Sequence, residues 1–434
     1  MELWDALTRL DFDRFLRAAA DLDSSGYYAL GIPAYLLLLF GERWLARLRG
    51  LPRTPFGRAI GNISAGLGAL VVGLFLAPLL IGLYLWGFDH LALVRWAPGS
   101  WVPWVLAFLL GDFGYYLNHR AGHRFGLLWT IHGVHHQCDS LDFTVAMRHP
   151  WLSDLSAIPF YAALPLAGVP PGHFFLAISV ISFYAFFVHT RVYDFPSLGF
   201  LVTPGSHIAH HAKNPRYMGK NLGAMFSLWD RLFGTFVVVD PAEPPVLGTP
   251  DGYRTHSGAF AQWIYVRDLW RVFWSAPDWR ARGQLLWARP GWVPPGGSRP
   301  EVTLARPDAT FSAGLRAYVT LQFGVTLILA VFVLWLRARH GLAIQVLLAA
   351  LVLASLASLG ALLDGRPRAR LREGVRLVIS AGLALWLATA PGYEWVGVAL
   401  CAVSVLGLGG LALARLGPPA APAGLAGLQR PGSP

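Results

Sequence analysis

Three short groups of histidines are the part of this chain best suited to chemistry. The sequences HRAGH, HGVHH and HIAHH give the spacings HxxxH, HxxHH and HxxHH. Residues three and four positions apart share one face of a helix, so each group can direct two or three imidazoles toward one point. Imidazole is a ligand for iron, zinc, copper and nickel. The eight residues are His119, His123, His132, His135, His136, His207, His210 and His211.

Eight candidate ligands exceed the needs of one tetrahedral zinc ion and suit two metal ions that keep open coordination positions. No cysteine lies within a group, which argues against a structural zinc or an iron–sulfur site. Insertion of oxygen into an unactivated C–H bond requires activation of O2, which the acid–base groups of a protein cannot supply. The pattern therefore predicts a dimetal site and favours a di-iron oxygenase.

Other polar residues lie close to these groups in the sequence. Asp112 precedes His119 by two helical steps, so we predict that its carboxylate orients an imidazole through the ring N–H, or else pairs with another buried polar group. His189 ends an apolar run and is predicted to be a ninth ligand, with an interfacial polar role as the alternative. His149 is predicted to act behind the ligands. The loops around the third group are expected to be fixed by Asn214, Asn221 and Asp230.

The composition indicates an all-α, multi-pass membrane protein. Of the 434 residues, 55% are hydrophobic and 14% are charged, whereas soluble domains have about 25% charged residues. The first residues lack a basic region followed by an apolar region, so no cleavable signal peptide is expected. Two cysteines cannot build a disulfide framework. The net charge of +11 comes mainly from arginines between apolar runs, which favours contact with anionic lipid over nucleic acid.

About nine transmembrane helices are predicted from apolar runs that approach the 20 residues needed to cross a bilayer. The runs lie near residues 26–41, 60–87, 101–118, 152–168, 173–190, 315–336, 342–363, 375–390 and 395–415. The run at 152–168 contains Pro159 and Pro165, so it is expected either to span or to re-enter.

Charge predicts the orientation of these segments. The loops 42–58 and 366–376 are rich in arginine and are expected on the cytoplasmic side, whereas the acidic first 25 residues are expected outside. Nine crossings then place 119–150 and 191–310 on the cytoplasmic side. All three histidine groups would share that face. The arginine bias indicates a bacterial source, and thus a site on the cytoplasmic side of a bacterial cytoplasmic membrane.

Composition also divides the chain into five predicted regions. They are an external segment (1–25), a catalytic membrane domain (26–240), a cytosolic Pro- and Trp-rich linker on the membrane surface (241–312), a C-terminal region of four membrane helices (313–416) and a disordered tail (417–434).

At this point the chain resembles a known family, the fatty acid hydroxylase/sterol desaturase superfamily of membrane di-iron enzymes. The stretches that carry the resemblance are GDFGYYLNHRAGH, LWTIHGVHH, TVAMRHP, HIAHHAKNPRYMGKNLG and WDRLFGTF, within residues 105–240. The resemblance implies that the eight grouped histidines, with His189 as a ninth, bind two iron ions. It also implies O2 as cosubstrate and a lipid alkyl chain or sterol-like substrate that is hydroxylated or desaturated.

Within this superfamily the chain is most similar to the alkylglycerol monooxygenase branch. FFVHT followed by TPGSHIAHH, and SLGALLDGRPRARLREGVR near the C-terminus, carry this wider similarity over residues 25–390. The branch implies cleavage of ether lipids and an external reductant, either a donor protein or a tetrahydropterin. One position departs from the branch, because Arg124 stands where the branch has a glutamate after the first histidine group.

Two other classes of protein fit part of the pattern. A zinc-dependent membrane hydrolase would need a carboxylate general base beside the metal, and the chain has no HExxH and only Asp139, Asp142 and Asp154 near the groups. A metal transporter would distribute its histidines through the depth of the bilayer, whereas these cluster at the ends of apolar runs. Bound zinc without dependence on O2 would favour either alternative.

Overall fold

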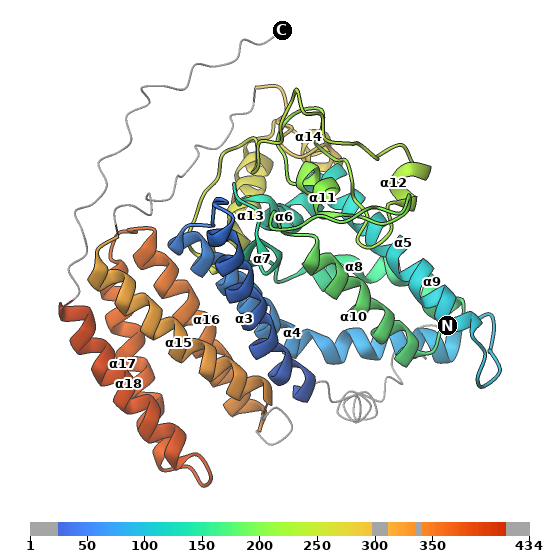
Figure 1. The fold of residues 1–434 in the computed structure, drawn as a ribbon. Coiled ribbons are helices and arrows are strands. Elements are labelled where there is room, and N and C mark those ends of the chain that lie inside the picture. The colour runs from blue at the N-terminus through green and yellow to red at the C-terminus, as the bar shows by residue number, and fades with distance from the viewer. Residues whose placement is uncertain (1–24, 297–310, 336–340, 414–434) are drawn as a thin grey trace.

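Helices make up almost all regular structure in the computed structural model, which describes residues 25–296, 311–335 and 341–413 (Figure 1). In these ranges β pairing is limited to two isolated bridges, Leu201–Phe226 and Ala212–Leu247. The predicted all-α class is therefore confirmed. Of the predicted regions, the tail 417–434 and all but the last residue of the segment 1–25 lie outside the described residues.

The helices of the N-terminal half precede or carry the histidine groups. They are α3 (Ser25–Leu48), α4 (Phe56–Leu91), α5 (Val102–Arg124), α6 (Gly126–His136), α7 (Phe143–Ala146), α8 (Ser153–Tyr161), α9 (Ala163–Leu166), α10 (Pro171–Phe187), α11 (Pro204–His210) and α12 (Leu228–Leu232). The later helices are α13 (Gly258–Ser275), α14 (Trp279–Trp287), α15 (Ala313–Trp335), α16 (Leu342–Leu363), α17 (Ala369–Ala388) and α18 (Glu394–Leu413).

All nine predicted apolar runs coincide with helices, and 152–168 is the broken pair α8 and α9. Four helices are long and apolar enough to cross a bilayer: Phe56–Leu91, Ala313–Leu334, Leu342–Leu363 and Glu394–Ala412. Helix α10 is apolar but shorter. The other runs form helices that are interrupted or carry charge, as α17 does with Arg372 and Arg376. The chain is thus a membrane protein, and nine crossings stay a prediction.

The C-terminal helices α15 to α18 form a bundle beside the histidine-bearing half (Figure 1). Leucines and valines such as Leu348 and Val352 fill its core. Inside this core the carboxylate of the fully buried Glu373 pairs with Arg376 at 2.6 Å, and Arg376 also donates to the side-chain oxygen of Gln322. A buried charge is costly unless it is paired and hydrogen-bonded, so this network fixes how α15 and α17 face each other.

Helix α4 joins the two halves through close contact with the start of α13. A Cβ atom added at Gly61 would lie 2.5 Å from the backbone oxygen of His256, and one added at Gly258 would lie 2.7 Å from the oxygen of Gly61. Such distances are shorter than van der Waals contact. Glycine at both positions therefore lets the backbones of α4 and the 256–258 segment touch, as small residues do in membrane helix interfaces.

This contact predicts that Gly61→Ala destabilises the protein. The added methyl group meets backbone atoms that cannot rotate away, and overpacking of this kind costs about 1–3 kcal/mol. We expect a lower midpoint of thermal unfolding for the detergent-solubilised variant. Gly73→Ala on the same helix is the matched control, because a Cβ there meets no atom within 4 Å. Equal unfolding midpoints for the two variants would contradict the close contact.

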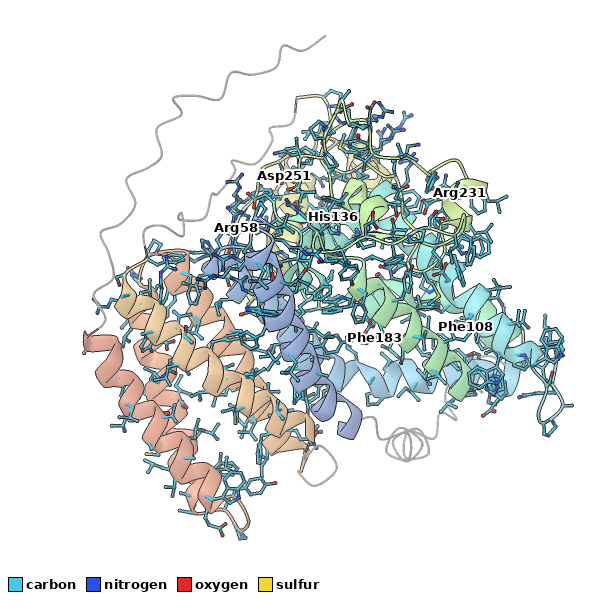
Figure 2. All side chains as sticks on the ribbon, in the orientation of Figure 1. Arg58, Phe108, His136, Phe183, Arg231 and Asp251 are labelled. Atoms are coloured by element: carbon cyan, nitrogen blue, oxygen red, sulfur yellow. The ribbon has the colours of Figure 1, made fainter. Side chains whose placement is uncertain are left out.

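The arginine-rich loops and the histidine groups lie at one end of the molecule. Arg58, which ends the first arginine-rich stretch and lies in the first turn of α4, forms an ion pair with Asp139, which follows the second histidine group. Asp364, next to the second loop, accepts a hydrogen bond from the backbone N–H of His256 at 2.7 Å. Figure 2 shows Arg58 and His136 toward the same end of the ribbon. The shared face predicted from charge is consistent with this arrangement.

The stretch 241–312 differs from the predicted linker, because its described part contains α13 and α14. Ser257 caps α13 by accepting from the N–H of Phe260, and Asp278 caps α14 by accepting from the N–H of Ala281. Helix α13 packs against α4, α6 and α16. The two caps and the apolar face of α13 give this part packed helical structure, and its predicted place on the membrane surface stays a prediction.

Candidate metal centre

The first two histidine groups lie on a tight helical hairpin. Helix α5 ends at Arg124 and α6 begins at Gly126, so only Phe125 separates them. Gly122 allows the helices to approach, because a Cβ there would lie 3.0 Å from the Cβ of His132. The imidazoles at the end of α5 therefore face those of α6.

Helix α11 brings the third group to the same place. Thr203 caps this helix. Its hydroxyl accepts from the backbone N–H of Ser206, and the hydroxyl of Ser206 accepts from the backbone N–H of Thr203. The reciprocal cap fixes the first turn of a helix that is only seven residues long. Both His207 and His210 are then buried, with 4% and 2% of their surface exposed.

The nine predicted ligands converge in space as two adjacent groups, each of which combines histidines from different sequence motifs. From here on, the first group and the second group are these two spatial sets, and the third histidine group is still the motif HIAHH. Within each group, one ligand atom from each residue lies within 4.8 Å of all the others. The first group contains His119, His123, His132, His136 and His210. The second group contains His135, His189, His207 and His211. Among the described residues, no carboxylate or thiol belongs to either group.

The Nε2 atoms within each group approach one another closely. In the first group, His132 Nε2 lies 3.1 Å from that of His123 and 3.0 Å from that of His136. In the second group, His189 Nε2 lies 3.1 Å from that of His135 and 3.0 Å from that of His207. A His nitrogen binds a metal at about 2.0–2.1 Å, so two such nitrogens at a right angle are about 3 Å apart. The spacing therefore fits cis ligands of one ion.

The other ring nitrogen of several histidines is fixed by a backbone carbonyl, which can only accept. His135 Nδ1 donates to the oxygen of Arg148 at 3.2 Å, and His189 Nδ1 donates to that of Ala185 at 2.7 Å. A neutral imidazole that donates through Nδ1 carries a lone pair on Nε2. The 3.1 Å between these two Nε2 atoms thus separates two lone pairs. Such an arrangement is repulsive without a cation and favourable with one.

The same tautomer is set in the first group. His119 Nδ1 donates to the oxygen of Leu222 at 2.7 Å, and His210 Nδ1 donates to that of Lys220 at 2.9 Å. The Nε2 atom of His119 is buried and has no hydrogen-bond partner. A buried polar atom without a partner is costly, so this lone pair is suited to a metal ion. The donor set of both groups fits two ions that prefer nitrogen ligands.

Burial keeps these imidazoles neutral. Loss of solvent lowers the pKa of His132, His136, His207 and His211 well below the usual range, and repulsion from neighbouring imidazoles lowers it further. Burial lowers the pKa of His210 to about 4, although the hydrogen bond to Lys220 opposes this. A neutral imidazole has a free lone pair, so the groups are ready to bind metal at neutral pH without releasing protons.

Asp112 does not hydrogen-bond to an imidazole, and the alternative prediction of another buried polar partner describes it. Its fully buried carboxylate accepts from the N–H groups of Met225 and Phe226 and from the indole N–H of Trp229, at 2.9, 3.3 and 2.9 Å. These hydrogen bonds go to a loop and not to an imidazole. The loop begins just after Leu222, whose oxygen accepts from His119. Asp112 therefore acts on a candidate ligand through the backbone.

Asp230 holds the other side of the same loop. Its carboxylate accepts from the N–H groups of Leu222 and Gly223, both at 2.8 Å, and from the hydroxyl of Thr235. Asn221 adds two hydrogen bonds to the oxygens of Ser206 and Val237. Asn214 likewise accepts from the N–H of Val246 and donates to Glu243. All three residues thus fix loops around the third histidine group, as predicted.

His149 lies apart from the two groups. Its side chain is exposed, and its Nε2 is 2.8 Å from the hydroxyl of Ser153. No contact with a ligand imidazole is among its hydrogen bonds in the described structure. His149 is close in the sequence to the motif HGVHH, but its exposed side chain belongs to neither of the two groups of converging imidazoles.

Arg148 is a functional candidate that the sequence patterns did not single out. It is 2% exposed, and its guanidinium donates to the oxygen of Val134 and to the side chains of Asn62 and Gln137. Its own oxygen accepts from His135. The residue therefore ties the end of α6 to α4 and orients one ligand. Its position in the quoted stretch TVAMRHP, as a lone cation among uncharged residues, was the only signal.

Glu42 supports the second group in a similar way. Its buried carboxylate accepts from the N–H of Phe143 at 2.7 Å and from the hydroxyl of Thr190, the residue after His189. Burial raises the pKa of Glu42 to about 7, because these hydrogen bonds only partly offset the loss of solvent. The end of α3 is thereby joined to the segment that carries the ninth imidazole.

Comparison with known proteins gives a consistent set of relatives. Residues 104–235 match the sequence model of a family described as "Fatty acid hydroxylase". Alkylglycerol monooxygenase of Danio rerio is 31% identical over 341 residues, which are 76% of this chain and 75% of that protein. The Homo sapiens alkylglycerol monooxygenase is 28% identical and covers 81% of each chain. Ornithine lipid hydroxylase OlsE of Rhizobium tropici is 31% identical over 30% of this chain and 41% of its own. No solved structure matches.

Proposed function

The chain belongs to the fatty acid hydroxylase family, among relatives that are alkylglycerol monooxygenases, and from this membership we propose that it is a membrane-bound, non-haem di-iron monooxygenase of lipids. In this reaction one oxygen atom of O2 enters a C–H bond of an alkyl chain. The other leaves as water, with two electrons and two protons from an external reductant.

The observation that carries the proposal is the set of imidazole lone pairs that face one another in two neighbouring groups. Each group would hold one iron ion. Two irons, when bound, supply the activation of O2 that protein groups cannot perform. The residues of the chain hold the nitrogen donors in place, keep them neutral and leave coordination positions open, because the first group has five imidazoles and the second has four.

The lipid chain is proposed to approach from the bilayer along α10. Phe183 is 48% exposed on this helix, and its ring packs edge-on against that of Phe187, with centroids 4.8 Å apart. Phe187 in turn contacts Phe143. His189 of the second group lies two residues after Phe187 in the sequence. Figure 2 shows Phe183 farther from the arginine-bearing end than His136. An apolar path from the bilayer to the second group excludes water and accepts an alkyl chain.

The substrate class to test first is an ether lipid, because alkylglycerol monooxygenases are the relatives that cover most of the chain. Hydroxylation of the carbon next to the ether oxygen gives a hemiacetal, which collapses to an aldehyde and an alcohol. We propose that the reductant is either a tetrahydropterin or a donor protein. Arg124, which is exposed beside the first group, is the difference to examine when the two reductants are compared.

The site is proposed to face the cytoplasm. The arginine-rich loops lie at the same end of the molecule as the histidine groups, and loops rich in arginine stay on the cytoplasmic side of membranes. Such an orientation would expose the centre to cellular reductants. Cysteine accessibility at Arg53→Cys, probed with a membrane-impermeant reagent on intact cells, tests it: labelling from outside would reverse the assignment.

The hydrolase and the transporter are not favoured. A hydrolase would need a carboxylate base beside the metal, and neither group contains one among the described residues. A transporter would spread its ligands through the bilayer, whereas these nine gather in one place. The relatives are also oxygenases by name.

The decisive experiment measures metal content and O2 uptake of the detergent-purified protein. We expect about two irons per chain and O2 consumption that depends on both reductant and an alkylglycerol or another long-chain lipid. Product mass spectrometry with ¹⁸O2 should place one labelled oxygen in the lipid product. Zinc alone, with no O2 uptake after iron is supplied, would overturn the proposal.

A further inference from the structure

A chain of aromatic rings leads away from the first histidine group. The ring centroid of Trp129 lies 5.4 Å from that of His123 and 5.7 Å from that of His136. The next ring is Tyr265, 5.7 Å from Trp129, and the last is Tyr253, 5.6 Å from Tyr265. These separations are those of directly packed aromatic pairs. Three aromatic side chains of α6, α13 and the preceding loop thus form one continuous path.

A glycine makes this path possible. A Cβ atom at Gly133 would lie 2.7 Å from Cε2 of Tyr265 and 2.8 Å from Cε2 of Trp129. Any side chain at this position would therefore push the two rings apart. Gly133 lies within the second histidine motif, between His132 and His135, so the path passes through the metal-binding segment itself.

Both tyrosines donate their phenolic protons to carboxylates. The Tyr253 hydroxyl donates to Asp268, and the Tyr265 hydroxyl lies 3.5 Å from Asp251 Oδ1. Both rings are buried, with 4% and 6% exposed. A phenol loses an electron far more readily when a base within hydrogen-bond distance takes its proton at the same time. A carboxylate is such a base, whereas a backbone carbonyl is not.

The far end of the path comes close to the solvent. Asp268 forms an ion pair with Arg267 at 2.9 Å, and the side chain of Arg267 is 27% exposed. Figure 2 shows Asp251 at the same end of the molecule as His136. The carboxylate that accepts from the last tyrosine is thus paired with a side chain that reaches the solvent.

From this geometry we propose that Trp129, Tyr265 and Tyr253 form a redox relay that removes oxidising equivalents from the metal centre when no lipid consumes them. The proposal rests on the proposed oxygenase function. Tyr253 loses one electron, and its phenolic proton moves to the Asp268 carboxylate. The electron passes through Tyr265 and Trp129 to the oxidised metal centre, which is reduced by one electron. A thiol or ascorbate then returns one electron to the phenoxyl radical, which recovers its proton from Asp268.

The relay would protect the ligands. An oxygenase that activates O2 without substrate oxidises its own side chains, and the nine imidazoles lie closest to the reaction. Moving the oxidising equivalent to Tyr253, which is buried but lies beside the Asp268–Arg267 ion pair, allows repair without loss of a ligand. The proposed path of the lipid chain, along Phe183 and Phe187, leads to the second group. The relay begins at the first group, so the two paths are separate.

The test uses the iron-loaded protein, reduced without oxygen, mixed with O2 in the absence of lipid and frozen for electron paramagnetic resonance. We expect a tyrosine radical in the wild type. In Tyr253→Phe the line shape changes, because the radical is confined to Tyr265, and Tyr253→Phe/Tyr265→Phe lacks the tyrosine signal. Tyr193→Phe is the matched control, because the Tyr193 hydroxyl donates to the backbone oxygen of Phe187 and has no carboxylate partner. Its radical should equal that of the wild type.

A second measurement follows the lifetime of the enzyme. With lipid present, the initial rate of the double variant should equal that of the wild type. Without lipid, it should inactivate after fewer turnovers, with oxidised Trp129 found by peptide mass spectrometry. A wild type that consumes O2 with lipid but forms no tyrosine radical, or a radical that survives in the double variant, would overturn the relay alone. A wild type without lipid-dependent O2 uptake would overturn the oxygenase function and the relay with it.

Discussion

His132→Ala and His135→Ala are each expected to abolish lipid oxidation while removing different metal ions. The two residues stand three positions apart in one motif, yet His132 belongs to the first group and His135 to the second. Loss of either should lower activity by at least about 10³-fold, because residues that act as a unit each cost nearly the whole activity when removed. Iron content should fall to about one ion per chain in each single variant and to almost none in the double variant.

The measurement is iron per chain together with the Mössbauer spectrum of protein loaded with ⁵⁷Fe. The two single variants should retain spectroscopically different sites, because one keeps the group of four imidazoles and the other keeps the group of five. His90→Ala is the control, since this exposed histidine belongs to neither group and contacts Trp86 of its own helix, through the backbone oxygen and the stacked indole ring. Identical residual spectra, or retained turnover in either variant, would contradict the division into two groups.

Asp230→Asn is expected to weaken metal binding without touching a ligand. One amide nitrogen would replace a carboxylate oxygen that accepts from Leu222, Gly223 or Thr235, so at least one buried donor would face another donor. The loop would shift, and with it the oxygen of Leu222 that orients His119. Loss of such outer contacts typically costs 10–100-fold in metal affinity or activity, and we expect an effect of about that size.

Iron affinity can be measured by competition with a chromophoric chelator. The amount of each variant recovered in the membrane fraction serves as a check on folding. Asp240→Asn is the matched control, because Asp240 lies in a neighbouring loop and pairs with Arg216 at a partly exposed position. Thr235→Val removes one of the three hydrogen bonds to Asp230, together with the contact to the Tyr116 hydroxyl, and should give a smaller loss in the same direction. Unchanged iron affinity in Asp230→Asn would show that the loop does not orient His119.

The sequence alone was enough to predict the helices and the convergence of the histidines. Apolar runs of nearly 20 residues and the helical spacing of the histidines are local patterns, and local patterns report local structure. Each of the nine runs coincides with a helix or a broken helix, and all eight grouped histidines and His189 lie in one of the two groups. The arginine-rich stretches and the histidines also share one end of the molecule, whereas the side of the membrane that the charge pattern indicates stays a prediction.

The segment 241–312 shows what local patterns left out. Its prolines and tryptophans predicted a linker, yet α13 lies against α6 and places Tyr265 beside Trp129. The packing depends on Gly61 and Gly258, which come from distant parts of the chain and carry no recognisable pattern on their own. Tertiary contact therefore overrode composition.

Only the tertiary structure decided which imidazole serves which group and which partners hold it. His135 and His136 are neighbours in the sequence but point into different groups, because successive helical positions differ by about 100°. The imidazoles of α5 lie in the group of His136, whereas His189 lies in the group of His135. Asp112 was predicted to orient an imidazole of its own helix or to pair with another buried polar group, and it accepts from Met225, 113 residues along the chain. Helical periodicity fixes the face on which a side chain lies, whereas its partner depends on how separate helices pack.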